Sequence, residues 1–386
     1  MSIKRIVAFT SIRSDYDLLS DLYKKIHQSS DMEIGLIVSG AHLSPLYGET
    51  YKQIEKDRIP ILAKIETLIS SDSNSARVKT ASLLMQNCLH TVEGYNPDVI
   101  LFAGDREDAM VAALVGSYLK IPTIHLFGGD HASDGNVDNP IRHACSKLSS
   151  LHFVTHLEHK KRLKAIGEDE NRVFVVGNPA LDKFKSMKYI QKDALLDKLN
   201  RNAWNNYAMV IFHPILSEEE NAGEYMKQIL SSLEKKNINA FVSYPNTDGG
   251  NYHIIEVINE YKNNPNFCFY KNLDRELFIN LMRNAAFLIG NSSSGLLEAP
   301  IVPLGVINVG LRQRGRLAAE NVIFVDQDLV QINQAIDTVT SKLFHEKLKE
   351  VESPYGNGNS VEKIYSLLNE IDFTEYLYKP EDPLNL

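Results

Sequence analysis

The sequence predicts an α/β fold built from two doubly wound, Rossmann-like domains. Short apolar runs typical of buried strands alternate with helical segments, and each run ends in a polar loop that contains glycine. The alternation restarts near residue 181, after which the chain becomes charged and helical before the next strand. This alternation is typical of a parallel sheet covered by helices on both faces, and such sheets bind ligands beyond the carboxyl ends of their strands.

The first half of the chain shows the strand pattern six times, in runs rich in β-branched and aromatic residues. Strands are expected at residues 5–10, 32–38, 99–103, 122–127, 151–155 and 173–177. Residues 18–26 have helical spacing, and the small residues of 109–119 predict a helix that lies close against a sheet. Together these elements predict an N-terminal domain at residues 1–180.

The second half repeats the pattern. Strands are expected at residues 209–212, 240–244, 267–270, 285–289, 306–310 and 322–325. Residues 361–371 predict a final helix. We therefore expect a C-terminal domain at residues 181–375, whose last helix could fold back on the N-terminal domain, and a polar tail at 376–386.

Length and composition restrict the class of protein. A chain of 386 residues is too long for one ordinary core, and 44% hydrophobic and 23% charged residues are typical of a soluble globular protein. The net charge of −8 disfavours a nucleic-acid partner. The start of the chain resembles neither a signal peptide nor a membrane span, so no membrane partner is expected. Three distant cysteines form no disulfide framework, which favours the cytoplasm.

The stretch from Gly290 to Arg316 is the strongest binding signal. The strand at 285–289 runs into Gly290, an amide, three serines and Gly295, and an apolar helical segment follows. Free N–H groups of such a loop, the serine hydroxyls and a helix dipole would together bind the phosphates of a nucleotide diphosphate. Glu298 has the wrong charge for phosphate but could accept hydrogen bonds from ribose hydroxyls. Arg312 and the basic residues after it could add positive charge. The alternative is a capped helix N-terminus, because Ser and Asn are preferred caps.

Carboxylates follow two strands of the first half. Asp105 comes directly after the strand at 99–103, although acids there could also serve a helix N-terminus. The segment from Asp130 to His143 follows the strand at 122–127 and carries Asp130, His131, Asp134, Asp138, Arg142 and His143. Neighbouring carboxylates repel, so their pKa values separate into one base and one acid. The acids lack metal-ligand spacing, so no metal is expected.

Two polar residues at strand ends in the second half are weaker candidates. His213 could donate to a leaving phosphate, although a lone histidine at a strand end is more often structural. Asn246, which follows the strand at 240–244, is likewise a candidate that could instead be structural. The chain has no GxSxG, GxxxxGK[ST] or early GxGxxG, which disfavours serine hydrolases, P-loop ATPases and standard dinucleotide enzymes.

Several short motifs between Ile6 and Ile371 are individually weak but specific in this order. They are Arg13-Ser14-Asp15-Tyr16, Ser39-Gly40-Ala41-His42-Leu43, Tyr47-Gly48-Glu49-Thr50-Tyr51, Gly104-Asp105-Arg106, Gly128-Gly129 with an acid, Ile141-Arg142-His143 with Lys147-Leu148, His213-Pro214, Pro245-Asn246, Gly290-Asn291-Ser292-Ser293 with Glu298, and Gly310-Leu311-Arg312-Gln313. Jointly they resemble the hydrolysing UDP-N-acetylglucosamine 2-epimerases, above all those of sialic acid and legionaminic acid synthesis.

The resemblance implies a GT-B architecture, with the active site in a cleft between two Rossmann-like domains. It implies a nucleotide-sugar substrate, UDP as a product, no cofactor and a homodimer. By position, the catalytic residues would be Asp105, Asp130, Asp138 and His213, with His143 beside the carboxylates. The UDP-binding residues would be Arg13, Arg106, His213, Asn246, Ser292, Ser293, Ser294, Gly295, Glu298 and Arg312. The N-terminal domain would then carry the catalytic acids and the C-terminal domain would bind UDP.

The implied reaction has two steps. A base removes the C2 proton while UDP leaves C1, and water then adds across the resulting 2-acetamidoglucal, which converts UDP-N-acetylglucosamine to N-acetylmannosamine. Two residues near the sugar depart from the family's pattern: Phe127 replaces an acid or histidine, and Asp130 replaces a glutamate. They leave open a second substrate, UDP- or GDP-N,N′-diacetylbacillosamine, whose product would be 2,4-diacetamido-2,4,6-trideoxymannose. A GT-B glycosyltransferase and a non-catalytic nucleotide-sugar sensor are the alternatives from other classes.

Overall fold

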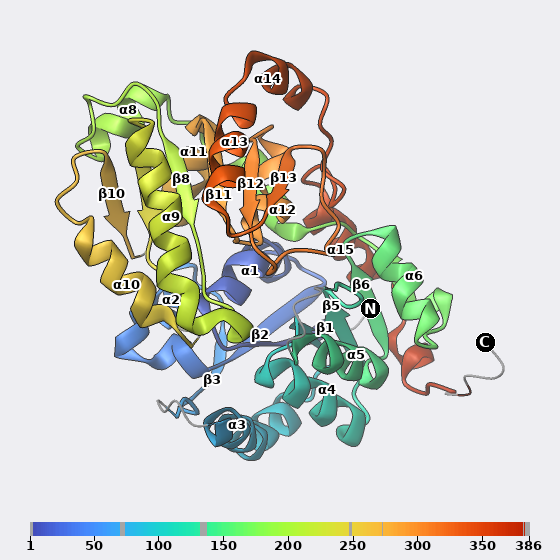
Figure 1. The fold of residues 1–386 in the computed structure, drawn as a ribbon. Coiled ribbons are helices and arrows are strands. Elements are labelled where there is room, and N and C mark those ends of the chain that lie inside the picture. The colour runs from blue at the N-terminus through green and yellow to red at the C-terminus, as the bar shows by residue number, and fades with distance from the viewer. Residues whose placement is uncertain are drawn as a thin grey trace. The chain divides into compact units, whose positions relative to one another are not determined.

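The computed structural model describes residues 3–69, 74–131, 137–246, 249–271, 273–380 and 382 (Figure 1). Within these residues the chain forms two compact units. Unit 1 comprises the described residues of Met1–Asp130, Val137–Lys183 and Tyr355–Leu386, and unit 2 comprises those of His131–Asn136 and Phe184–Pro354. Asp134, one of the acids singled out above, lies outside the described residues.

Unit 1 contains a seven-stranded sheet in the described residues, with the order β3-β2-β1-β4-β5-β6-β7 and all neighbouring strands parallel. Its strands are β1 (Lys4–Thr10), β2 (Met32–Ser39), β3 (Ile61–Ile65), β4 (Val99–Ala103), β5 (Thr123–Leu126), β6 (Leu151–Val154) and β7 (Val173–Val175). Side chains of β1 are buried on both faces, which explains its continuous apolar sequence. The sequence did not predict β3, a short strand at the edge of this sheet.

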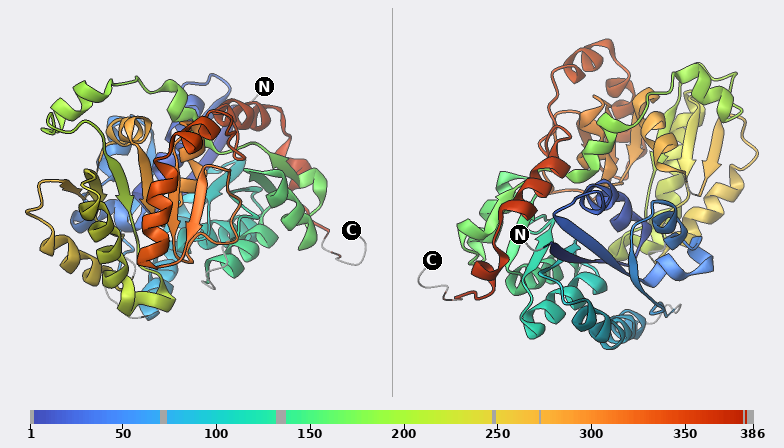
Figure 2. Two further views of the ribbon diagram at one scale, coloured as in Figure 1. Left: turned by 45° about the horizontal axis from the view of Figure 1, so that its top comes forward. Right: turned by 180° about the vertical axis from the view of Figure 1, so that it is seen from behind.

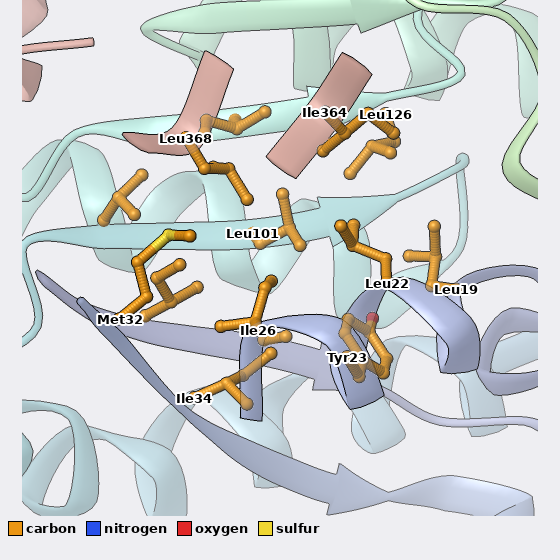
Figure 3. Close-up of a cluster of buried hydrophobic side chains, with 14 of the residues drawn as sticks. Leu19, Leu22, Tyr23, Ile26, Met32, Ile34, Leu101, Leu126, Ile364 and Leu368 are labelled. Atoms are coloured by element: carbon orange, nitrogen blue, oxygen red, sulfur yellow. The ribbon is translucent and has the colours of Figure 1, made fainter. Parts of the chain in front are cut away.

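Helices cover both faces of this sheet (Figure 2). They are α1 (Arg13–His27), α2 (Tyr51–Lys56), α3 (Asn74–Tyr95), α4 (Glu107–Leu119), α5 (Asp138–Leu148), α6 (Leu157–Ala165) and α15 (Ser360–Glu370). On one face, α1 and α15 share a core with alternate strand residues such as Ile6 and Leu101 (Figure 3). On the other, α3, α4 and α5 contact the residues between them, such as Val7 and Ile100.

The last helix belongs to unit 1, although most of the chain before it belongs to unit 2. Ile364 and Leu368 of α15 are fully buried beside Leu22 and Ile26 of α1 (Figure 3). Burial of each such side chain contributes about 1.5–3 kcal/mol. Unit 1 is therefore completed by residues from both ends of the sequence.

Unit 2 contains a six-stranded parallel sheet in the described residues, with the order β10-β9-β8-β11-β12-β13. Its strands are β8 (Ala208–Ile211), β9 (Ala240–Ser243), β10 (Phe267–Tyr270), β11 (Phe287–Gly290), β12 (Val306–Val309) and β13 (Val322–Val325). Its helices are α8 (Lys192–Lys198), α9 (Ala222–Lys235), α10 (Asn251–Glu260), α11 (Arg275–Asn284), α12 (Ser294–Leu297), α13 (Leu329–Val339) and α14 (Lys342–Leu348), while α7 (Asp182–Ser186) lies where the chain passes from unit 1 to unit 2.

Two hydrophobic clusters cover the two faces of this second sheet. Helices α9, α10 and α13 contribute to one, and α8 and α11 contribute to the other. The predicted doubly wound α/β fold with two Rossmann-like units is therefore confirmed. Among the described helices, none combines the length and the apolar character needed to cross a lipid bilayer.

Candidate functional site

The strand order of unit 1 reverses between β1 and β4. The helix after β1 lies on one face of the sheet and the helix after β4 lies on the other. A crevice opens at such a switch point, beyond the carboxyl ends of the two strands. Asp105 lies in the loop after β4, and Arg13 opens α1 shortly after β1. The structure thus brings two of the predicted site residues to the position where doubly wound sheets bind ligands.

Arg142 joins two predicted catalytic segments. This residue of α5 is only 6% exposed, and its Nη2 forms an ion pair with Oδ2 of Asp105. Its Nη1 donates to the carbonyl oxygen of Asp130 at 3.0 Å and to Oδ1 of Asn139 at 3.2 Å. A buried guanidinium with a carboxylate partner is strongly oriented, because breaking the pair would leave an uncompensated buried charge. Arg142 therefore fixes the loops after β4 and β5 relative to each other.

Asp138 and His143 lie on the same helix as Arg142. Asp138 is the first residue of α5, four positions before Arg142, so the two side chains emerge from the same face. Burial raises the pKa of Asp138, and the charge of Asp105 raises it further, while Arg106, Arg77 and Arg142 oppose the rise. This rise favours the protonated form of Asp138. His143 is half-buried beside Arg142.

His125, which the sequence did not single out, contacts both α5 and the loop that carries Asp105. Its ring is buried and lies 5.1 Å from the ring of Phe102 in a stacked geometry. Burial lowers its pKa to about 3, so the ring is neutral at pH 7. Nε2 lies 2.8 Å from the carbonyl oxygen of Gly104, which can only accept, so this nitrogen carries the proton. Nδ1 lies 3.0 Å from Oγ of Ser146 on α5. His125 therefore links α5 to the residue before Asp105.

The loop after β5 brings Asp130 against α6. Gly129 has φ +75°, and a Cβ there would collide with the carbonyl oxygen of His159, so this position requires glycine. The buried Asp130 places Oδ1 3.7 Å from Nε2 of His159, whose Nδ1 lies 2.9 Å from Oγ1 of Thr155. Sequence reasoning missed His159 because nothing in the pattern of α6 separates it from the other polar residues of that helix.

Phe127 adopts an unusual backbone conformation just before these glycines. Its φ of +65° lies in the left-handed region, which non-glycine residues rarely adopt. The side chain is half-buried against the cluster shared by α1 and α15. An aromatic ring with an apolar neighbourhood therefore stands at the carboxyl end of β5, three residues before Asp130.

A second pair of carboxylates lies at the same switch point. Asp108 of α4 is buried and accepts a hydrogen bond from Oγ of Ser11 at 2.8 Å. Burial raises the pKa of Asp15 of α1 well above its usual range, and the charge of Asp108 adds to the rise. Burial raises the pKa of Asp108 as well. From the sequence, an acid at Asp108 was expected only to serve the N-terminus of a helix, because burial cannot be predicted from a single helical turn.

The two predicted arginines of unit 1 occupy opposite sides of this switch point. Arg13 is partly exposed, and its Nε lies 3.3 Å from Oδ2 of Asp17 one turn along α1. Arg106 immediately precedes α4 as its N-cap. Its charge lowers the pKa of Asp15, Asp108 and Asp138, although burial outweighs it in each case.

The strand order of unit 2 reverses between β8 and β11, and the predicted nucleotide residues follow these strands. The backbone N–H of His213 donates to Oδ1 of Asn291 at 2.8 Å, and Nδ2 of Asn291 donates to the carbonyl oxygen of His213 at 2.7 Å. The backbone N–H of Asn246 donates to Nδ1 of His213 at 3.1 Å. Burial lowers the pKa of His213 to about 3, with a smaller contribution from Arg312. The neutral ring therefore keeps its proton on Nε2, which can donate to a ligand.

The serine loop differs from its prediction in one respect. The helix that it opens, α12, spans only Ser294–Leu297 and continues as a 3-10 turn, so it has little dipole to offer a phosphate. The hydroxyls of Ser292 and Ser294 lie 2.9 Å apart. Among the described residues, the backbone N–H groups of Ser292 and Ser293 donate no hydrogen bond. Donors from backbone and hydroxyls, rather than a helix end, make this loop suited to an anion.

Contacts on both sides of the serine loop hold it in place. The carbonyl oxygen of Asn291 accepts from Nη1 of Arg312 at 3.2 Å and from Nε2 of the buried Gln313 at 3.0 Å. Gly290 has φ +138°, and a Cβ there would collide with the carbonyl oxygen of Ile211. Gly295 lies against Val306.

Glu298 is buried at the end of α12 and forms an ion pair with Arg275 through Oε1. The guanidinium of Arg275 also lies over the rings of Phe184 and Phe278, at 5.6 Å and 5.4 Å from their centroids. The sequence predicted Glu298 but not its partner, because Arg275 lies 23 residues earlier in the chain. The ion pair orients the carboxylate that was predicted to accept ribose hydroxyls. No group of three metal-ligating side chains occurs among the described residues.

Comparison with known proteins gives a consistent result. The UDP-N-acetylglucosamine 2-epimerase family matches residues 24–369. The chain is 34% identical to the UDP-N,N′-diacetylbacillosamine 2-epimerase (hydrolyzing) of Legionella pneumophila, over 96% of both chains. It is 35% identical to the GDP/UDP-N,N′-diacetylbacillosamine 2-epimerase (hydrolyzing) of Campylobacter jejuni, over 89% of both chains.

A solved structure shows the same fold. The crystal structure of UDP-GlcNAc 2-epimerase from Neisseria meningitidis bound to UDP-GlcNAc has a TM-score of 0.78 and 18% identity, and covers 96% of this chain and 100% of its own. The family match spans most of the chain, and the two relatives exceed 30% identity over nearly its full length. This chain therefore belongs to the UDP-N-acetylglucosamine 2-epimerase family and is a hydrolysing nucleotide-sugar 2-epimerase.

Proposed function

We propose that this enzyme converts UDP-N,N′-diacetylbacillosamine and water to 2,4-diacetamido-2,4,6-trideoxymannose and UDP. The observation that carries the proposal is the similarity to two enzymes named for this sugar, at 34% and 35% identity over most of the chain. This proposal differs from the sequence-based expectation, in which UDP-N-acetylglucosamine was the first candidate substrate and the diacetylbacillosamine nucleotide the second. Phe127 supports the change, because an aromatic side chain suits a sugar whose C6 is a methyl group better than one with a hydroxyl.

The proposed reaction breaks the C2–H and C1–O bonds of the sugar in its first step. One carboxylate takes the C2 proton, the electron pair forms the C1=C2 double bond, and UDP leaves with the pair of the C1–O bond. In the second step a water hydroxyl bonds to C1 and a proton returns to C2 from the opposite face. The reaction therefore needs at least one group that is charged and one that holds a proton.

Asp105 and Asp138 suit these two roles. Asp105 forms an ion pair with the buried Arg142, which supports a part as base or as electrostatic partner. Burial and the neighbouring Asp105 raise the pKa of Asp138, which supports a part as proton donor. Asp130 is held by its backbone to Arg142 and lies near His159, so it would contact the sugar beside them.

The UDP part of the substrate would bind to unit 2. The serine loop supplies N–H and hydroxyl donors for the diphosphate, with Arg312 and the neutral His213 beside it. Glu298 would accept from the ribose. Removing the C2 proton is difficult because that proton is only weakly acidic, so donors to the leaving diphosphate would lower the barrier as its charge develops.

The test is proton NMR of the purified protein in D2O with each nucleotide sugar. We expect UDP-N,N′-diacetylbacillosamine to give UDP and a free mannose-configured sugar with deuterium at C2. Turnover of UDP-N-acetylglucosamine at equal or higher kcat/KM would contradict the proposed substrate but would support the proposed type of reaction. Absence of turnover with both, in protein that binds UDP, would contradict the reaction itself and favour a transferase or a sensor. An acceptor sugar that increases UDP release would identify the transferase.

A further inference from the structure

The C-terminal segment of unit 1 contacts the helix that carries the predicted sugar-side residues. After η7 (Phe373–Tyr376) the chain runs beside the end of α5 and the turn before β7, and it hydrogen-bonds to both (Figure 2). Nη1 of Arg172 donates to the carbonyl oxygen of Tyr376 at 3.0 Å, and its Nη2 donates to that of Tyr378 at 2.6 Å. The Tyr378 side chain is 75% exposed, so its backbone, not its ring, is what holds this segment.

Lys379 then reaches the carboxyl end of α5. Its Nζ donates to the carbonyl oxygens of Ser146, Lys147 and Ser149 at 3.4, 3.0 and 3.1 Å. The last carbonyl groups of a helix lack partners within the helix, and they form the negative end of its dipole. An ammonium group at this point both satisfies these acceptors and carries the favourable charge.

A buried carboxylate fixes the position of this ammonium group. Glu168 has a side chain with no exposed surface, and its Oε2 lies 2.6 Å from Nζ of Lys379 and 2.7 Å from Nε2 of His152. Its Oε1 lies 3.1 Å from Nζ of Lys147, which belongs to α5. One carboxylate thus joins the C-terminal segment, β6 and α5. The Lys379 side chain is only 14% exposed, so water screens the contact weakly.

The same end of α5 continues directly into the site. Ser146, whose carbonyl group accepts from Lys379, has its Oγ 3.0 Å from the carbonyl oxygen of Arg142 one turn earlier. Ser146 also contacts His125, and Arg142 holds Asp105 and the backbone of Asp130. Among the described residues, two turns of α5 and its side chains connect Lys379 with these aspartates.

We propose that Lys379 is a positioning residue for turnover: residues 376–379 fix the end of α5, and α5 in turn holds Arg142 against Asp105 and Asp130. The role in turnover rests on the proposed function. Small displacements of catalytic groups are costly, since an error of about 1 Å can reduce the rate about 100-fold. UDP binding, assigned to unit 2, should depend little on Lys379.

The experiment compares Lys379→Met with Lys363→Met, a control that removes an exposed lysine from α15 of the same unit. Turnover is measured per UDP-binding site, in protein whose circular dichroism and thermal unfolding match wild type, so that molecules with an unfolded unit 1 do not count. We expect Lys379→Met to lower kcat by about 10- to 100-fold, with KM and the Kd for UDP changed less than about threefold. Lys379→Arg, or millimolar n-butylammonium added to Lys379→Ala, should restore much of the loss, whereas the control should stay within about twofold of wild type.

Two results would overturn the proposal. One is a folded Lys379→Met protein with kcat within about twofold of wild type. The other is a loss of kcat that neither arginine nor the alkylammonium restores, which would indicate a general structural effect. If Lys379→Met does not fold, Lys147→Met removes the α5 side of the same carboxylate contact and should give a smaller loss of the same kind.

Hydrogen–deuterium exchange separates this inference from the proposed reaction. Without any substrate, Lys379→Met should accelerate amide exchange in the second half of α5 relative to Lys363→Met. Unchanged exchange there would overturn the positioning role whatever the reaction proves to be. If Lys379→Met exchanges faster but the wild type turns over neither nucleotide sugar, the positioning contact is supported and the proposed function is refuted.

Discussion

Units 1 and 2 share the strand order around their switch points but offer opposite chemistry there. The loops of unit 1 bring together Asp105 and Asp130, with the buried Arg142 between their segments. Unit 2 presents an amide, serine hydroxyls and a neutral histidine, and its buried Glu298 is paired with Arg275. The parallel sheet thus fixes where a ligand binds, while the residues just after each strand decide which ligand binds and what happens to it.

The difference has a physical reason in each unit. A diphosphate carries negative charge, so a site for it needs donors and must exclude free carboxylates. Proton transfer at carbon needs a base and an acid. Where carboxylates fill both roles, an arginine or a bound proton offsets the repulsion between them. Unit 1 has the ion pair of Arg142 with Asp105, and burial raises the pKa of Asp138, which favours its protonated form.

The largest expected effect comes from replacing one glycine of each unit with alanine. Gly290→Ala places a Cβ into the carbonyl oxygen of Ile211, and we expect it to lower the free energy of unfolding by more than about 4 kcal/mol. Gly104→Ala has the same φ problem, at +81°, but a Cβ there meets no described atom within 4 Å. It should cost only about 1–2 kcal/mol. Chemical denaturation measures both, and equal losses would refute the distinction.

The second test separates chemistry from binding. Asp105→Asn removes the charge that Arg142 neutralises, and we expect kcat to fall by about 10²- to 10⁴-fold. The Kd for UDP should stay within about threefold, because unit 2 is assigned to UDP. Ser293→Ala should do the reverse, weakening UDP binding by about two- to tenfold. Steady-state kinetics and calorimetry with UDP decide the matter. A strong loss of UDP affinity in Asp105→Asn would end the proposed division of roles.

The third test compares the stability of the two units as the pH is lowered. Burial lowers the pKa of His42 to about 4 and that of His125 to about 3, both in unit 1, while unit 2 has His213 at about 3. In the unfolded chain these rings take up a proton near pH 6.5, and in the folded protein they do so only near pH 3–4. Stability is therefore full above pH 6.5 and is lost as the pH falls toward 4, by about 2 kcal/mol for each ring at pH 5.

Unit 1 should therefore open first in acid. Glu168 adds to this: burial alone would raise its pKa, but the contacts with His152 and Lys379 outweigh burial and lower the pKa to about 2. Its contribution is complete above pH 4.5 and is lost as the pH falls toward 2. Peptide-resolved hydrogen exchange at pH 5 and pH 7.5 would show the order, with His125→Gln as the variant that reduces the difference. Faster acid opening of unit 2 would contradict it.

The smallest expected effect concerns Glu298. Glu298→Ala should weaken UDP binding by about tenfold through lost ribose contacts. Arg275→Met should give a smaller loss, because the carboxylate remains but is no longer oriented by its partner. Unchanged UDP affinity in Glu298→Ala would remove the ribose assignment and leave the pair a structural one.

The fold was predictable because its signals are local. Runs such as those of β1 and β4 are continuous and apolar, since strands of a covered parallel sheet are buried on both faces. The edge strand β3 is only partly buried and includes a lysine, so its sequence shows no comparable continuous apolar run. The four-residue length of α12 was not predicted either, because Pro300 allows a short helix without fixing its end.

The site was predictable only in part, for the same reason. Residues that directly follow a strand, such as Asp105 and His213, can be found by position. Their partners cannot: Arg142 lies 37 residues from Asp105, and Arg275 lies 23 residues from Glu298. Which acid keeps a proton also depends on burial and on neighbouring charges, which appear only when the chain is folded.

The placement of α15 and Lys379 in unit 1 has a consequence for synthesis on the ribosome. Domains usually fold in the order in which they emerge, but unit 1 lacks part of its core until residues beyond Tyr355 have been translated. Unit 2, encoded later, has its whole sequence by Pro354 and can mature first. A nascent chain that stops early would therefore retain the loop assigned to UDP and lack the helix and lysine that complete the other unit, so an unfinished product could bind the nucleotide without consuming the sugar.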